Sequence, residues 1–175
     1  GAFCDIGCGI VSLLPIDSIS VSRISHPRDR FYTGMEIKAI IKSIDYDSGR
    51  IYLSHKELLG TWEENVARFS VGQTVSGIIR STEPYGIFIE LAPNLAGLAE
   101  IKDGAVTGQS AAVYIKNIIP EKMKVKLALI DSYFPASAAP APFEYFTDAT
   151  HIDRWVYSPE NSSRIIETVF GDEIQ

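Results

Sequence analysis

The sequence predicts an all-β protein made of two tandem five-stranded barrels, the first lacking its first strand, followed by a C-terminal β-hairpin. Three observations predict this architecture. Apolar and polar residues alternate along most segments, turn-forming residues interrupt them at short intervals, and two stretches of the chain repeat each other. Small barrels of this kind bury alternate residues of each strand and leave the others to solvent.

The alternation has a period of two, which is the period of a β-strand and not of a helix. Gly, Asp, Asn and Pro separate the alternating segments, so each strand is short and ends at a turn. The clearest segments are 36–42, 50–54, 74–80 and 124–127. Residues 56–69 instead space their apolar side chains as a helix does, and Gly60-Thr61 predicts a break or a new N-cap there.

An internal repeat relates the two barrels. Residues 1–6 align with 86–91 at an offset of 85, whereas residues 50–53 align with 124–127 at an offset of 74. The second copy therefore has the same fold with 11 residues fewer in one loop, because the offset falls from 85 to 74. In the first copy that loop contains the stretch 18–33.

The two copies differ at their beginnings. Residues 71–79 predict a first strand for the second copy, and the first copy has no equivalent because its alignment starts at the second strand. A barrel without strand one has an open edge and a partly exposed core. We expect either that the sequence is a fragment of a longer protein or that another segment fills that edge, and we favour the fragment.

Composition and pattern divide the chain into five parts. A Pro- and Ala-rich stretch is typical of a semi-stiff connector. Beyond it, residues 151–157 and 164–170 predict the strands of a hairpin, which must pack on another part of the protein. The expected parts are the incomplete first barrel 1–57, the helical connector 58–70, the second barrel 71–131, the linker 132–142 and the hairpin tail 143–175.

Composition and charge limit the classes of function. The 175 residues carry a net charge of −6 with the acidic excess in the tail, so both barrels are near neutral and purely electrostatic binding of nucleic acid would be weak. Two cysteines are too few for a disulfide framework, and the first residues lack the basic region of a signal peptide. No apolar run approaches the ~20 residues that span a bilayer. We expect a cytoplasmic protein.

Short motifs recur at matching positions of the two copies. In the first copy they are Gly1-Ala2-Phe3, Leu13-Leu14, His26-Pro27, Gly34, Ile44-Asp45 and Gly49-Arg50-Ile51-Tyr52-Leu53-Ser54. In the second copy they are Val71-Gly72, Tyr85-Gly86-Ile87-Phe88, Gly97-Leu98 and Lys124-Val125-Lys126-Leu127. Over residues 1–131 this set resembles the RNA-binding domain named after ribosomal protein S1. The resemblance implies a five-stranded barrel of the OB type that binds RNA.

Outward side chains of these motifs form a candidate surface for single-stranded RNA. Tyr85 and Phe88 are three residues apart, so a bulge at Gly86 is needed to bring both rings to one outer face. Alternate residues of each last strand bring cations to one face, and rings flanked by cations suit bases and phosphates. The candidate RNA-binding residues are Phe3, Arg23, His26, Arg28, Arg30, Asp45, Arg50, Tyr52, Tyr85, Phe88, Lys124 and Lys126.

Each kind of candidate has an expected role. The residues expected to stack on bases are Phe3, Tyr85 and Phe88. Arg50, Lys124 and the loop arginines bind phosphates, whereas Asp45 orients Arg50 or accepts a hydrogen bond from a base or a sugar. The expected partners are single-stranded RNA, in particular mRNA during translation, and the ribosome. Neither a membrane nor a small-molecule substrate is expected.

The second copy departs from the pattern that the resemblance implies. Where the family usually has a histidine, Pro15 stands in the first copy and Glu100 in the second, and a carboxylate beside a phosphate path repels it. Ile119 replaces the expected aspartate. Such degenerate copies are expected to contact protein. The alternative function is therefore an adaptor that docks on the ribosome or an RNA-processing enzyme, and a third is a fragment of a larger enzyme whose barrels recruit RNA.

No catalytic or metal site is expected. Cys4, Cys8 and the three histidines are scattered, whereas zinc needs four ligands at tight spacing. His55 has no nucleophile or carboxylate pair beside it in the pattern. We therefore expect a binding protein without a cofactor and not an enzyme.

Overall fold

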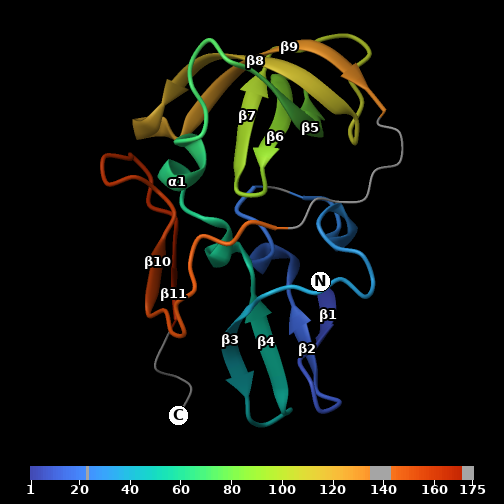
Figure 1. Cartoon of the computed structure of the whole chain (residues 1–175), viewed down its shortest axis with the longest axis vertical. Coiled ribbons are helices and arrows are strands. Elements are labelled where there is room, and N and C mark those ends of the chain that lie inside the picture. The colour runs from blue at the N-terminus through green and yellow to red at the C-terminus, as the bar shows by residue number, and fades with distance from the viewer. Residues whose placement is uncertain (23, 135–142, 171–175) are drawn as a thin grey trace.

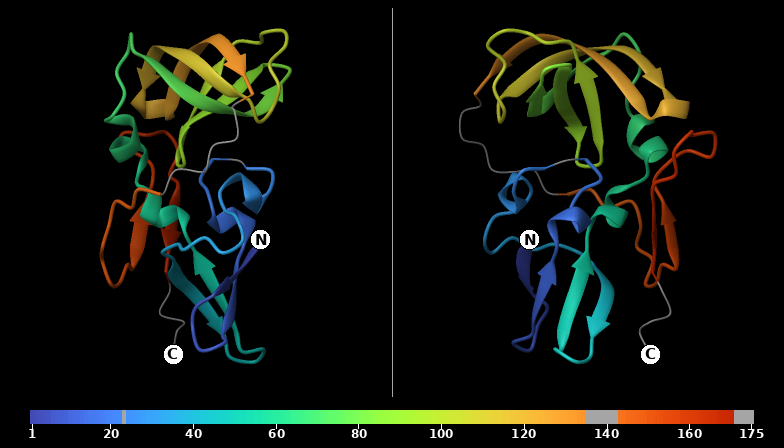
Figure 2. Two further views of the ribbon diagram at one scale, coloured as in Figure 1. Left: turned by 45° about the vertical axis from the view of Figure 1, so that its right-hand side comes forward. Right: turned by 180° about the vertical axis from the view of Figure 1, so that it is seen from behind.

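The computed structural model describes residues 1–22, 24–134 and 143–170, which form two sheets and a hairpin joined by short helical turns. Figure 1 shows the two sheets at opposite ends of the long axis, with the hairpin beside the N-terminal sheet. The two views in Figure 2 show the same arrangement from other sides. Within the described part of the chain, no helix is long and apolar enough to cross a bilayer.

The C-terminal of the two sheets is a closed barrel with the strand order β5-β6-β7-β9-β8, in which β8 pairs back to β5. Its strands are β5 (Thr74–Glu83), β6 (Gly86–Ala92), β7 (Leu95–Ala99), β8 (Ser110–Ile119) and β9 (Lys124–Tyr133). Alternate residues point inward, so Ile79, Ile89 and Ile115 are fully buried in its core. The predicted all-β class and a closed five-stranded barrel are confirmed.

The N-terminal sheet has four strands in the order β1-β2-β4-β3. They are β1 (Ala2–Asp5), β2 (Val11–Leu14), β3 (Ile40–Asp45) and β4 (Arg50–Ser54). Leu14, Ile19 and Leu53 form its buried centre. Since the barrel strands β6, β7, β9 and β8 follow each other in the same order, the sheet matches the barrel strand for strand except at β5.

The match between the two sheets extends to single residue pairs. Phe3 lies opposite Leu13 as Phe88 lies opposite Leu98, which reproduces the offset of 85 found in the sequence. The β3–β4 and β8–β9 ladders are also irregular at equivalent places, which fall between Ile41 and Ser43 and between Ile115 and Asn117. The repeat seen in the sequence is therefore present in the hydrogen-bonded register, including its bulge.

The N-terminal sheet is open where the barrel is closed. In the barrel, β5 pairs with β6 on one side and with β8 on the other. β1 and β3 are the equivalents of β6 and β8, and among the described residues each of them pairs on one side only. The alternative that another segment of the chain fills this edge is therefore wrong for the residues that the structure describes.

A short helical connector joins the sheets. A 3-10 turn, Lys56–Leu59, leads through Gly60 into α1 (Trp62–Val66). Thr61 is the N-cap of α1: its hydroxyl accepts from the Glu64 backbone N–H at 3.1 Å, and the Glu64 carboxylate accepts from the Thr61 N–H at 3.0 Å. The predicted N-cap after Gly60 is confirmed.

The long loop between β2 and β3 reaches the barrel and forms a buried ionic network there. Arg30 and Glu90 of β6 are paired, and their side chains are only 3% and 6% exposed. The Arg30 guanidinium also donates to the Pro93 carbonyl at 2.8 Å. Arg80 of β5 donates to Glu90 at 2.9 Å and to the Asp29 carbonyl at 3.2 Å. Two arginines thus share one buried carboxylate across the contact between the sheets.

The C-terminal hairpin packs against α1 and the barrel. Its strands β10 (Arg154–Val156) and β11 (Glu167–Val169) are antiparallel and shorter than the predicted 151–157 and 164–170. Tyr157 is 5% exposed and belongs to the core cluster of the barrel together with Trp62. The Trp62 N–H donates to the Tyr157 carbonyl at 3.0 Å. The hairpin therefore gains the packing that an isolated hairpin lacks.

The segment before the hairpin encloses a buried histidine. The rings of Phe143 and Tyr145 lie 4.8 and 5.6 Å from the His55 ring, and the Tyr145 hydroxyl is 3.1 Å from His55 Nε2. His55 is fully buried. Burial, with a smaller effect of the Arg30 charge, lowers the pKa of His55 to about 4. His55 is thus a neutral packing residue at neutral pH.

Candidate nucleic-acid interface

The Phe3 ring stands on the outer face of the N-terminal sheet. Its neighbours in β1, Ala2 and Cys4, pack against the core, and Phe3 itself is 76% exposed. Phe3 pairs with Leu13 of β2, and Leu13 pairs with Tyr52 of β4. Phe3, Leu13 and Tyr52 therefore form one row across three strands, on the face away from the core.

An equivalent row crosses the barrel. Phe88 pairs with Leu98, and Leu98 pairs with Lys126. Tyr85 adds a second ring to this row: it is 67% exposed, and its centroid lies 6.0 Å from that of Phe88 in an edge-to-face arrangement. The predicted pair of neighbouring outward rings is present on the barrel.

The predicted reason for this pairing of rings is wrong. The β5–β6 ladder continues to the pair of Glu83 with Gly86, and no register shift occurs at Gly86. Tyr85 lies instead in the two-residue turn between these strands. The turn, and not a bulge, brings the Tyr85 ring beside Phe88.

Cations border both aromatic rows. Arg50 is exposed at the start of β4 and shares the outer face with Tyr52, two residues further on. Lys124 and Lys126 are exposed at the equivalent positions of β9, where they alternate with the buried Val125. Each sheet thus presents aromatic and cationic side chains on one face, which suits bases and phosphates of a single strand.

Asp45 has a local role that the sequence pattern did not predict. It lies opposite Arg50 in the β3–β4 ladder. Its Oδ1 accepts from the backbone N–H groups of Asp47 at 3.0 Å and Ser48 at 3.3 Å. Hydrogen bonds from Ser48, then from Asp47, lower the pKa of the Asp45 carboxyl. An Asp that opens a turn of this kind is a known turn former, which is the signal that could have revealed the role.

The predicted RNA-binding residues of the long loop have different environments in the structure. His26 caps the 3-10 turn Pro27–Asp29, and its Nδ1 accepts from the backbone and side chain of Arg28, both at 3.1 Å. Arg28 is exposed. The prediction that Arg30 binds phosphate is wrong, because its guanidinium is buried against Glu90. Arg23 lies outside the described residues.

Two leucines complete the rows and were missed from the sequence. Leu13 and Leu98 lie in the middle strand of each row, between an aromatic ring and the residue on the last strand. Both follow from combining the offset of 85 with strand alternation, so the signal was available. Glu100, the expected source of repulsion, is 91% exposed and lies 3.8 Å from Lys116, which offsets part of its charge.

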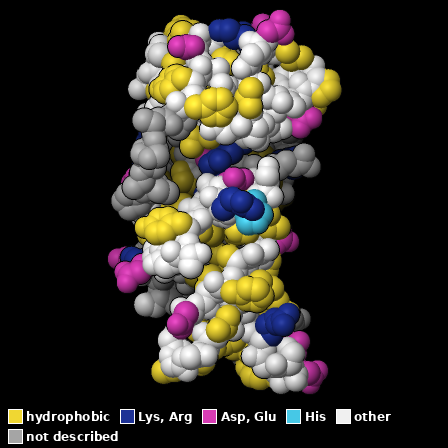
Figure 3. All heavy atoms as spheres, turned by 90° about the vertical axis from the view of Figure 1, so that its right-hand side faces the viewer, with side chains coloured by type: hydrophobic (Ala, Val, Ile, Leu, Met, Phe, Trp, Pro, Cys, Tyr) yellow, Lys and Arg dark blue, Asp and Glu magenta, His cyan; other side chains and the backbone are white. Residues whose placement is uncertain are grey.

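Both sheets expose hydrophobic side chains on one side of the molecule (Figure 3). Figure 3 shows hydrophobic side chains gathered over the barrel above and the four-stranded sheet beneath, with Lys or Arg side chains and a histidine between them. On the barrel, Glu90 shares a face with Phe88 because the two are separated by one residue. The aromatic row of the barrel therefore borders the contact that the long loop makes.

Known proteins resemble the chain in both of its sheets. Residues 1–56, which contain β1 to β4, match the S1 RNA binding domain family. The small ribosomal subunit protein bS1 of Chlamydia muridarum is 32% identical over 142 residues, and that of Rhizobium meliloti is 31% identical over 142 residues. The bS1 protein of Staphylococcus aureus is 29% identical in an alignment that covers all of this chain.

The chain spans less than half the length of these curated relatives. Its match covers 25% of the Chlamydia and Rhizobium proteins, and 46% of the Staphylococcus protein. The alignments with the Chlamydia and Rhizobium proteins each cover 74% of this chain. The similarity therefore extends beyond residues 1–56 into the closed barrel.

Proposed function

Since the chain is an S1-like protein with an S1 RNA-binding domain in residues 1–56, we propose that it binds single-stranded RNA in a ribosome-associated translation role. The specific ligand that we propose is mRNA. Its relatives are ribosomal proteins by name, which supports a place beside the ribosome in the cytoplasm. The role is binding and not catalysis.

The observation that carries this proposal is the pair of equivalent aromatic rows. Phe3 on the N-terminal sheet and Phe88 on the barrel occupy the same register position and both face away from their cores. A base stacked on such a ring gains about 1–3 kcal/mol, and stacking does not depend on net charge. An acidic chain can therefore bind RNA when its rings face solvent and its local cations lie beside them.

We also propose that both sheets are OB-type barrels in tandem, the first of them incomplete. The shared strand order, the shared register and the shared bulge support this reading. OB barrels bind oligonucleotides across the strands that contain these rows. The proposed contacts are stacking by Phe3, Tyr85 and Phe88, with phosphates held by Arg50 and Lys124.

The experiment is a titration of fluorescent oligo-U with the whole chain and with substituted chains. Phe3→Ala is expected to weaken binding about 5- to 150-fold, which corresponds to the loss of one stacked base at about 1–3 kcal/mol. The double variant Tyr85→Ala/Phe88→Ala removes two rings and is expected to weaken binding by at least as much. Tyr133→Ala is the matched control, since Tyr133 is an exposed barrel tyrosine at the far end of β9. Equal affinity of all four proteins would overturn the proposal.

The second candidate function is a protein-interaction adaptor that docks on the ribosome or an RNA-processing enzyme. The exposed Glu100 and the acidic net charge of −6 favour it. An adaptor predicts no saturable binding of oligo-U. It predicts instead that purified ribosomes depleted of accessible mRNA retain the chain, and that Tyr85→Ala/Phe88→Ala leaves this retention unchanged.

A further inference from the structure

The tail residues 143–146 pack against the N-terminal half of the molecule. The Phe143 ring lies 5.6 Å from the ring of Phe31, in the long loop, and 4.8 Å from that of His55, which directly follows β4. The Tyr145 hydroxyl is 3.1 Å from His55 Nε2. Two rings of this segment therefore contact both the end of β4 and the loop between β2 and β3.

The same segment also contacts the connector between the two sheets. The Phe146 N–H donates to the Leu58 carbonyl at 2.9 Å. Arg68, just beyond α1, lies with its guanidinium 4.7 Å from the centroid of the Phe146 ring and pairs with Glu144. Gly60 allows this close packing, since a Cβ there would lie 2.8 Å from the Phe146 ring. Segment 143–146 therefore bridges the N-terminal sheet and the connector.

The rest of the tail links this segment to the barrel. The Tyr157 hydroxyl donates to the Asn94 carbonyl, in the turn between β6 and β7. The Asn94 side chain donates in turn to the Gly60 carbonyl of the connector at 2.9 Å. The Ser163 N–H donates to the Glu121 carbonyl at 3.0 Å, in the turn between β8 and β9. Tail residues thus contact the N-terminal sheet, the connector and the barrel, and these contacts restrain the orientation of one sheet relative to the other.

The long loop lies between the two aromatic rows. At the barrel, Arg30 of this loop pairs with Glu90, which shares a strand face with Phe88. At the N-terminal sheet, Arg28 of the same loop and Phe3 of β1 border one hollow of the surface. The two residues of the loop, only two positions apart, thus connect the surroundings of one row with those of the other.

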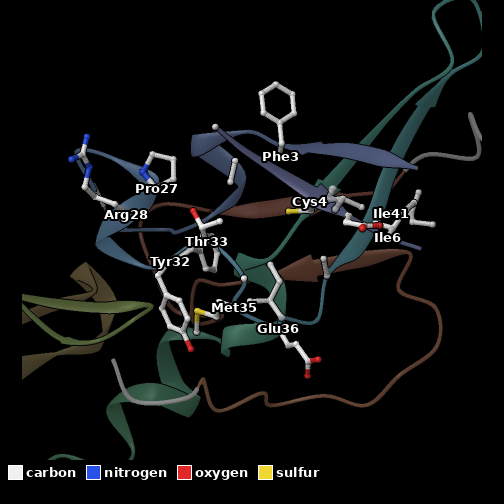
Figure 4. A pocket seen from close by; sticks show the side chains of 18 residues that line it. Phe3, Cys4, Ile6, Pro27, Arg28, Tyr32, Thr33, Met35, Glu36 and Ile41 are labelled. Carbon is white, nitrogen blue, oxygen red and sulfur yellow. The ribbon is translucent and has the colours of Figure 1, made fainter. Parts of the chain in front are cut away.

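The rows and the loop between them face one side of the molecule. Figure 3 shows hydrophobic side chains of both sheets on this side, with Lys or Arg side chains between them. In Figure 4, Phe3 projects away from Met35 and Glu36, and Arg28 lies on the loop toward the barrel. Arg28 is exposed, and its guanidinium N–H groups can donate to a phosphate. A strand of RNA stacked on both rows would therefore pass a cation between them.

We propose that tail residues 143–146 position the N-terminal sheet relative to the barrel so that one strand of RNA binds both aromatic rows at once and meets Arg28 between them. This inference rests on the proposed function, because it assigns both rows to the same ligand. Binding to the second row is then intramolecular, and avidity can exceed the affinity of either row about 100- to 10,000-fold when the geometry allows both contacts. Phe143 and Tyr145 pack on the buried His55 and belong to neither row, so they are positioning residues.

The test compares two lengths of fluorescent oligo-U on the whole chain. An oligomer of about 4 nucleotides fits one row, whereas one of about 20 nucleotides exceeds the site of a single barrel and can reach both rows. The double variant Phe143→Ala/Tyr145→Ala should bind the longer oligomer about tenfold more weakly, because the effective concentration of the second row falls. Its affinity for the shorter oligomer should not change, which also shows that each row is still folded. Ile165→Ala, at an exposed site of the same tail, is the matched control and should change neither affinity.

A charge reversal tests the contact between the rows independently of the tail. Arg28→Glu should weaken binding of the longer oligomer several-fold and that of the shorter oligomer less, because only the longer one crosses the loop. Arg164→Glu is the matched control, since Arg164 is an exposed arginine on the hairpin. It should leave the ratio of the two affinities unchanged.

Failure of this inference can be told apart from failure of the proposed function. If the unmodified chain binds the shorter oligomer but gains nothing from the longer one, only the inference is overturned. Unchanged binding of the longer oligomer by Phe143→Ala/Tyr145→Ala, or an equal loss for both lengths, would overturn it too, since neither result is a change of orientation. If the unmodified chain binds neither oligomer, the proposed function falls together with the inference.

Discussion

At the scale of single residues, the ionic contact of Glu90 with Arg30 and Arg80 shows how burial makes the stability of the protein depend on a charged pair. Removing Glu90 would leave the Arg30 guanidinium buried without a counter-charge. The variant Glu90→Ala is expected to lower the free energy of unfolding by about 3–5 kcal/mol, as is typical for breaking a buried pair. Denaturant unfolding of the whole chain measures this loss.

The matched control for Glu90→Ala is Glu144→Ala. Glu144 pairs with Arg68, and both side chains are largely exposed to solvent. Little change in unfolding free energy is expected there, because exposed pairs contribute little. Equal effects of the two substitutions would show that the Arg30–Glu90 pair adds nothing through its burial.

His55 should give the protein a dependence of stability on pH. Its pKa is about 4 in the folded protein and 6.5 in the unfolded chain, so between these values the unfolded chain binds more protons. The stability that comes from keeping His55 neutral is fully present above pH 6.5. The free energy of unfolding falls by about 3 kcal/mol as the pH approaches 4. Urea unfolding at pH 7.5, 5.5 and 4.5 measures it.

A His55→Gln variant isolates the contribution of this histidine to the pH dependence. The substitution removes the titrating group, so the variant should lose less stability than the unmodified chain over the same interval. Parallel curves for the two proteins would contradict the assignment of a buried, neutral His55.

The sequence predicted outward-facing rings better than it predicted the environment of charged residues. Strand alternation placed Phe3 and Phe88 correctly, because it depends only on neighbours along the chain. Arg30 was interpreted as a phosphate ligand because its loop is rich in cations, yet its partner Glu90 is 60 residues away in the chain. A pairing of that kind depends on how the two sheets dock, which no local pattern contains.

At the scale of elements, the hairpin β10–β11 depends on one buried side chain. Tyr157 is 5% exposed and contacts the barrel core, whereas Ile165 on the same hairpin is 70% exposed. Tyr157→Ala is expected to lower the unfolding free energy by about 3–5 kcal/mol, and Ile165→Ala should change it little. Thermal melting of both variants measures the difference. Equal melting temperatures would mean that the hairpin does not support the barrel.

The sequence predicted which strands are equivalent, but it did not predict where their ladders are irregular. Offsets of 85 and 74 gave the pairing of equivalent strands, since a repeat copies its register with its residues. The bulges between Ile41 and Ser43 and between Ile115 and Asn117 were not predicted. A bulge is set by the curvature that closes a sheet, so neither strand reveals it when considered alone.

At the scale of the whole molecule, a chain with a net charge of −6 and few cations beside its rings should bind RNA with a shallow dependence on salt. If Arg50, Lys124 and Lys126 provide the phosphate contacts, the slope of log K against log salt is expected near −2, at about −0.7 for each contact to a single strand. Titration of oligo-U at several salt concentrations measures the slope. A slope steeper than about −5 would indicate that electrostatic contacts, and not stacking, dominate.

The loop that carries Ser20 and Arg30 has one more consequence, for how the molecule tumbles. Both side chains reach the Pro93 carbonyl of the barrel, at 3.1 and 2.8 Å, and the shorter loop of the second copy has no counterpart for these additional residues. These contacts of the longer loop thus restrain the rotation of the N-terminal sheet relative to the barrel. If the loop is shortened to the length found in the second copy, the N-terminal sheet and the barrel should tumble more independently. Nitrogen-15 relaxation measures this as less correlated rotational diffusion of the two parts.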